Sequence, residues 1–140
     1  MKPGFEKEFT DIQSGLIALC LEGVAVNPDI VYAYAYIGEG NSMFNVFFEC
    51  AGTILPSHKV IQDRSLLLQV FEFGTEDLEK LRSLCVEYET KCPVEMKMCY
   101  NCITKKYYAD FTYETNIDMD GFSPHDSFLE WRNEIASAKD

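Results

Sequence analysis

Basic residues are scarce in this chain of 140 residues: 12 lysines and arginines stand against 23 aspartates and glutamates, a formal net charge of −11. A protein that binds the phosphate backbone of nucleic acid needs a basic face, so the composition argues against such a binder. The chain also lacks a Gly-x-Ser-x-Gly motif, a glycine-rich phosphate loop and a His-Glu-x-x-His motif. Its only two histidines, His58 and His125, are expected to be ordinary surface residues. We therefore expect no enzyme activity.

Long hydrophobic runs are missing as well. No stretch reaches the roughly 18 apolar residues that a membrane-spanning helix requires. The first residues lack the apolar core of a signal peptide. These absences predict a cytoplasmic protein that does not contact a membrane, and its six cysteines should then be mostly reduced.

What is present is enough for a real core. Apolar residues make up 47% of the chain and aromatic residues 14%, which is far too much for an acidic disordered segment. The length is typical of a single domain, so we treat residues 1–140 as one unit.

Hydrophobic periodicity indicates both helices and strands. Phe5, Phe9 and Leu16 fall on one helical face of the first segment. In a later helix Gly74 lies on the apolar stripe, so it either allows close approach to the sheet or divides the helix in two. Ser123 and Pro124 are typical of the cap and first turn of a last helix.

The strand signal is strongest over residues 30–37, where tyrosines alternate with small and branched residues. The small-residue face should receive a helix, which would leave the tyrosine face half-exposed to water. Residues 51–59 read as a loop with room for a short edge strand. The expected elements are a helix over 3–21, strands over 30–37 and 42–50, a helix over 63–91, strands over 94–100 and 106–113, and a final helix from about 124.

This order, α-β-β-α-β-β-α, contains two hairpins. It predicts an α+β fold with a mainly antiparallel sheet packed against helices.

Several local strings within this order resemble the YezG-like antitoxin family. They include the tyrosine strand over 31–37 with its glycine-rich turn, the acidic helix over 77–84, the strand over 108–114 and the closing segment over 128–132. The resemblance covers most of the chain. It implies a non-enzymatic bacterial immunity protein that binds and silences a cognate toxin, expected to be a nuclease, without a cofactor.

The charge pattern locates a candidate contact surface. From Asp110 to the end there are eight acidic and two basic residues, more than half of the net charge of −11. The simpler explanation is a solvated surface that aids solubility. The functional explanation is a face that steers onto a basic toxin. For this face we select aromatic anchors and acidic residues: Tyr108, Tyr113, Glu114, Asp118, Asp120, Phe122, Asp126, Glu130 and Trp131. For Trp131 a place in the core is an equal or better alternative.

Two other functions remain open. Cys92, Cys99 and Cys102 have a spacing that partly resembles a zinc or redox site, although four ligands are usual for zinc and ordinary thiols explain them as well. Cys20, Cys50 and Cys85 are predicted to be small core residues. The third possibility is a homo-oligomeric structural or ligand-binding domain, and a homodimer is also compatible with the antitoxin hypothesis.

Overall fold

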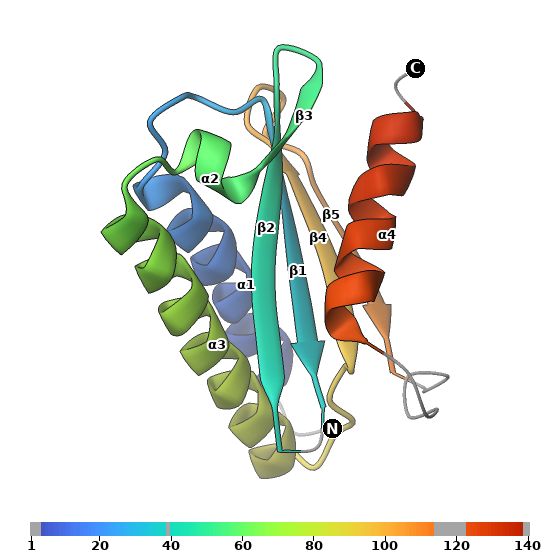
Figure 1. The fold of residues 1–140 in the computed structure, drawn as a ribbon. Helices are drawn as coiled ribbons and strands as arrows, with labels where there is room; N and C mark the ends of the chain where they lie inside the picture. The colour runs from blue at the N-terminus through green and yellow to red at the C-terminus, as the bar shows by residue number, and fades with distance from the viewer. Residues whose placement is uncertain (1–3, 39, 114–122, 139–140) are drawn as a thin grey trace.

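The computed structural model describes residues 4–38, 40–113 and 123–138, and it has an α+β architecture. A five-stranded antiparallel sheet has helices α1 and α3 side by side on one face and α4 on the other (Figure 1). The expected fold class is confirmed. The elements are α1 (Phe5–Glu22), β1 (Ile30–Ile37), β2 (Ser42–Cys50), β3 (Thr53–Pro56), α2 (Ser57–Val60), α3 (Arg64–Glu87), β4 (Glu95–Asn101), β5 (Tyr107–Thr112) and α4 (Pro124–Ser137).

The strand order is β3-β2-β1-β4-β5, so the two predicted hairpins are joined through β1 and β4. In β1, Tyr34 lies opposite Asn45 of β2 and opposite Lys97 of β4. The central place of β1 suits its composition, because a strand with helices over both faces needs apolar residues on both.

The first core lies between the sheet and the pair α1 and α3. Val31, Ala33 and Ala35 of β1 face this pair and are fully buried. Their small side chains let the helices approach closely. At Gly74, a Cβ atom would lie 2.3 Å from Cδ2 of Phe44 on β2. Because α3 runs through Gly74 without a break, close approach is the reason for this glycine.

The second core lies under α4, and here one expectation was wrong. The tyrosine face of β1 is not half-exposed: Tyr32 is 5% exposed and Tyr34 is fully buried. The ring of Tyr32 stacks on Phe47 at 4.6 Å, and Trp131 of α4 packs edge-on against Tyr32 at 5.8 Å. The sequence pattern of β1 carries no sign of this cover, because α4 lies about ninety residues further along the chain.

The segment after β2 forms the short edge strand that the sequence left open, and it also contains a helical turn in place of the expected loop. β3 pairs with β2, with Leu55 opposite Phe48, and the single turn of α2 follows directly. A strand of four residues is too short for its alternation to stand out in the sequence. Pro56 is tolerated at the end of β3 because β3 is an edge strand.

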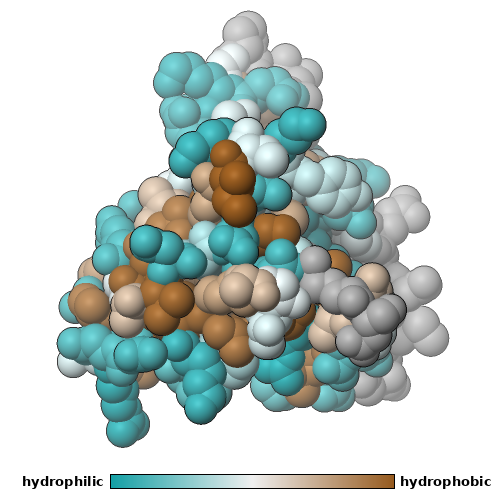
Figure 2. All heavy atoms as spheres, turned by 90° about the horizontal axis from the view of Figure 1, so that it is seen from above, coloured by the Kyte–Doolittle hydropathy of each residue, from teal (hydrophilic) through white to brown (hydrophobic). Residues whose placement is uncertain are grey.

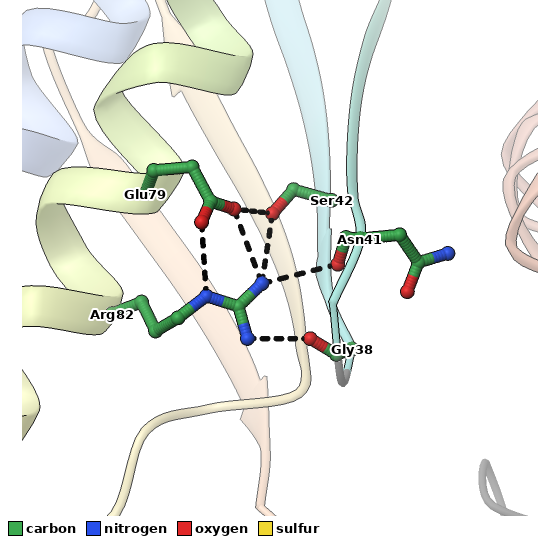
Figure 3. Close-up of polar contacts among 5 residues, drawn as sticks. All are labelled: Gly38, Asn41, Ser42, Glu79 and Arg82. Carbon is green, nitrogen blue, oxygen red and sulfur yellow. Dashed lines mark hydrogen bonds and ion pairs between the residues drawn. The ribbon is translucent and has the colours of Figure 1, made fainter.

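The end of the first hairpin is fastened to α3 by Arg82 (Figure 3). The Arg82 guanidinium donates to the carbonyl oxygens of Gly38 at 2.5 Å and Asn41 at 3.2 Å. It also donates to Ser42 Oγ and to both carboxylate oxygens of Glu79. The hydrogen bonds from Arg82 and Ser42 lower the pKa of Glu79 below its ordinary value. The network joins Gly38, Asn41 and Ser42 to α3 through the planar guanidinium of Arg82.

One end of the molecule exposes apolar side chains. Figure 2 looks down on the end of the molecule where α2 and the turn between β4 and β5 lie, and apolar side chains are exposed there among polar ones. Ile103 of that turn is 71% exposed. Among the described residues, no helix combines the length and apolar character needed to cross a membrane.

Candidate protein-interaction surface

The exposed side of α4 carries a row of carboxylates. Asp126, Glu130 and Glu134 are all exposed, and their spacing of four residues places them along one helical face. The Ser123 side chain accepts a hydrogen bond from the backbone N–H of Asp126, as the sequence predicted for the cap of this helix. Phe128 and Trp131 occupy the buried side. The amphipathic pattern of α4 therefore fixes which way the acidic row points.

A buried polar contact holds α4 in this orientation. Glu95 of β4 is 7% exposed, and its carboxylate accepts hydrogen bonds from Tyr34 Oη at 2.5 Å and Ser127 Oγ at 2.6 Å. Burial, followed by the bond to Glu95, raises the pKa of Tyr34, which therefore remains a neutral donor. The contact connects α4 to β1 and β4 at once, and it gives the helix a single register on the sheet.

A cavity of about 260 Å³ separates α4 from the edge of the sheet. Tyr108 and Asp110 of β5 line it on one side, and Trp131 and Glu134 of α4 line it on the other. Tyr108 is 66% exposed. The exposed ring of Tyr108 thus lies beside the carboxylates of Asp110 and Glu134, and the ammonium group of Lys97 lines the same cavity.

The remaining predicted contact residues are distributed unevenly. Tyr113 is 41% exposed just after β5. Trp131 is 8% exposed and packs on Phe47 at 5.0 Å, so it belongs to the core and is not an accessible anchor. Four of the predicted residues lie outside the described part of the chain: Glu114, Asp118, Asp120 and Phe122.

The three cysteines of the metal or redox hypothesis do not gather. Cys99 packs with the cluster under α4, whereas Cys92 and Cys102 pack with the core under α1 and α3. Consecutive residues of a strand point to opposite faces of the sheet, so two residues three positions apart also face opposite sides. Cys99 and Cys102 therefore lie on different sides of the sheet. Within the ranges 4–38, 40–113 and 123–138, no three histidine, cysteine, aspartate or glutamate side chains are close enough to hold a metal ion.

One thiol contact was not predicted. Cys85 of α3 and Cys92 of the following loop are hydrogen-bonded through their side chains. Burial raises the pKa of Cys92 to about 12, so its thiol is a poor nucleophile. No cysteine in the described chain forms a disulfide. Cys20 and Cys85 are core residues, as predicted, and Cys50 packs at the margin of the core.

A second acidic surface lies between α1 and α3. An open groove of about 780 Å³ has Ile12 and Leu84 among its lining residues and carries one basic side chain, Lys80. Its acidic residues come from both helices: Glu8, Asp11, Glu76, Glu79 and Glu87. The sequence showed that the helix over 77–84 is acidic, but the contribution of α1 depends on how the two helices pack.

The two histidines do not belong to either surface. His58 lies in α2 and His125 in the first turn of α4, and both are exposed, as predicted.

Comparison with models of known protein families gives no match to this chain, and comparison with curated proteins gives none either.

Proposed function

We propose that this chain is a non-catalytic immunity protein that neutralises a basic toxin, in the manner of the YezG-like antitoxins it resembles. The observation that carries the proposal is the row of Asp126, Glu130 and Glu134 on the exposed face of α4. It is held on a helix whose orientation is fixed by Ser127 and by the rings beneath it. A preorganised row of carboxylates loses little entropy when a cationic surface docks on it.

The physical basis is electrostatic complementarity. A nuclease must present lysine or arginine side chains to the phosphates of its substrate, so an acidic protein can approach and cover that surface. Such steering raises the association rate and weakens with added salt, because the Debye length falls to about 8 Å at physiological ionic strength. We expect direct binding to the toxin protein and no contact with nucleic acid or membrane.

The proposal predicts that the reading frame adjacent to this one encodes a toxin with a basic C-terminal domain, and that domain, purified, is the binding probe of the test. Association is measured by stopped-flow fluorescence at low and high salt for the wild-type chain and for Asp126→Lys/Glu130→Lys/Glu134→Lys. We expect the triple variant to associate about tenfold or more slowly at low salt, with the difference shrinking at high salt.

A matched control reverses the other acidic surface. The variant Glu8→Lys/Glu76→Lys/Glu87→Lys changes the same number of charges in the groove between α1 and α3. If steering acts at α4, this variant associates nearly as fast as the wild type apart from the effect of net charge. Equal slowing of both variants would reject a localised face, and no binding of the neighbouring basic domain would reject the immunity function.

A further inference from the structure

The two edges of the sheet are protected to different degrees. β3 is four residues long, ends in Pro56 and is followed at once by α2. β5 is longer, with six residues, and contains neither proline nor glycine. Tyr107 and Tyr108 of β5 are 43% and 66% exposed. No described strand pairs with the outer side of β5. An unpaired strand edge of this kind is a template for pairing with another strand, and natural proteins usually block it.

The free edge of β5 offers backbone groups in a known pattern. The carbonyl oxygens of Lys106 and Thr112 accept hydrogen bonds from Asn101 and Val94, so both point toward β4. Backbone groups alternate in direction along a strand. The N–H and C=O groups of Tyr107, Ala109 and Phe111 therefore point outward, where the described residues provide no sixth strand.

When two copies of this edge run antiparallel, the side chains of one copy are complementary in charge and size to those of the other. The segment runs Lys106, Tyr107, Tyr108, Ala109, Asp110, from a cation through a central ring to an anion. Lys106 and Asp110 are exposed, and neither forms an ion pair with another described residue.

We propose that β5 is a subunit interface, at which a second copy of this chain adds its own β5 antiparallel across a twofold axis at Tyr108. In this register Lys106 lies opposite Asp110 of the second copy, and the reverse pair repeats on the other side of the axis. Tyr107 lies opposite Ala109 of the second copy, which matches a large side chain with a small one. The sheet that results is continuous through both subunits.

The register also provides hydrogen-bond partners for outward-pointing backbone groups of β5. Tyr107 and Ala109 of the second copy exchange both N–H···O bonds, and this happens twice by symmetry, so the outward groups of these residues are paired. Tyr108 occupies the site between these bonded pairs, where opposing Cα atoms come closest, at about 4.5 Å. Such positions favour aromatic pairs. The cavity of about 260 Å³ that Tyr108 lines beside α4 leaves room for the ring of the second copy.

The face of β5 on the side of α1 also carries an ordered side chain for contact with the second copy. Tyr107 lies over a groove of about 380 Å³ bordered by α1, and its hydroxyl donates to Gln13 Oε1 at 2.6 Å. This bond fixes the Tyr107 ring before a second copy arrives. Ala109 of the second copy then meets an ordered ring rather than a mobile one, which reduces the entropy lost on association.

The interface assigns Tyr108 to contact between copies rather than to the toxin. Of the acidic row on α4, only Glu134 lines the cavity beside β5, and the dimer contacts are made by residues of β5 and its preceding turn, none of which belongs to that row. The inference therefore does not rest on the proposed function, and either one can fail alone.

The test is a charge swap measured by sedimentation velocity of the full chain over a range of concentrations. The wild type is expected to dimerise. Lys106→Asp and Asp110→Lys each replace two attractive pairs with two repulsive ones, and each should weaken the dimer by about tenfold or more. The double variant Lys106→Asp/Asp110→Lys restores opposite charges across the axis and should dimerise like the wild type.

Mixing the two single variants provides a second measurement that does not depend on the double variant. The Lys106→Asp chain presents carboxylates at both positions, and the Asp110→Lys chain presents ammonium groups at both. Every charged contact in the mixed dimer therefore joins a lysine to an aspartate, so native mass spectrometry should find the heterodimer in excess over either homodimer.

The control for the charge swap is Lys80→Asp, a change of an exposed charge on α3 away from the edge, which should leave dimerisation unchanged. A monomeric wild type would overturn the proposal and leave the edge to a strand of another protein. A dimer that neither single variant weakens would overturn it too.

Discussion

Gly74 is the residue at which helix propensity and packing oppose each other most directly. In an exposed helix, replacing glycine by alanine stabilises by up to about 1 kcal/mol. At Gly74 a Cβ atom would lie 2.3 to 3.0 Å from three ring carbons of Phe44. We expect Gly74→Ala to lower the free energy of unfolding by about 1–3 kcal/mol, because the buried ring must shift.

The matched control is Gly15→Ala in α1, where nothing lies within 4 Å of the added Cβ atom. This variant should raise the free energy of unfolding by up to about 1 kcal/mol. Urea denaturation of both variants checks the pair, and a stabilising Gly74→Ala would show that α3 does not lie as close to β2 as described.

Arg82 is the second residue whose role depends on its neighbours. Its hydrogen bonds to two carbonyl oxygens fix the end of the first hairpin on α3. We expect Arg82→Ala to cost about 2 kcal/mol of unfolding free energy, since several charge-assisted bonds are lost together. Lys80→Ala removes a cation that is 72% exposed and 3.6 Å from Asp77. It should change stability by less than about 0.5 kcal/mol, as is usual for surface pairs. Thermal and urea denaturation would distinguish the two, and equal effects would contradict the special place of Arg82.

At the scale of elements, α4 docks on the sheet through both apolar and polar contacts. Ser127→Ala and Tyr34→Phe each remove one donor to Glu95. We expect each substitution to lower the free energy of unfolding by about 1–2 kcal/mol. The effects of the two substitutions in the double variant should be coupled, because both donors share one carboxylate oxygen. The chain has one tryptophan, Trp131, and it lies in this core, so its fluorescence reports whether α4 is docked. Ser137→Ala at the exposed end of α4 is the control, and additive effects with unchanged emission would reject the coupling.

At the scale of the whole molecule, buried phenols and thiols set the response to alkaline pH. Burial raises the pKa of Tyr32 to about 12 and that of Cys92 to about 12. Burial also raises the pKa of Tyr34. The unfolded chain loses these protons at lower pH than the folded chain, near pH 9 for the thiol and pH 10 for the phenols. Their stabilising contribution is therefore complete below about pH 9 and declines as the pH rises toward about 12.

The slope expected from linkage is up to about 1.4 kcal/mol per pH unit for each group that titrates only when unfolded. Urea denaturation across this alkaline range measures it. Tyr32→Phe keeps the stacked ring and removes one titrating group, so its stability should decline less steeply. Parallel curves for Tyr32→Phe and the wild type would show that Tyr32 does not contribute.

Patterns among neighbouring residues predicted only part of the candidate surface. The cap at Ser123 and the spacing of Asp126 and Glu130 are local features, and both led to the correct helix and to an acidic row along it. Trp131 could not be assigned between core and surface, because that depends on which sheet face α4 covers. The groove between α1 and α3 was missed for a similar reason, since Glu8 and Glu76 come together only through helix packing.

The amino-acid sequence by itself determined the long helices and strands, because hydrophobic periods of about 3.6 and 2 residues and the helix caps act over a few neighbouring residues. It also determined that the chain is strongly acidic and has enough apolar residues for a core. Only the tertiary structure decided that α4 covers the tyrosine face and that Cys85 rather than Cys99 lies beside Cys92. It also decided that, among the described residues, β5 is the last strand of its side of the sheet. These features arise from contacts between segments far apart in the chain, which depend on the order of strands in the sheet and on the face to which each helix is directed.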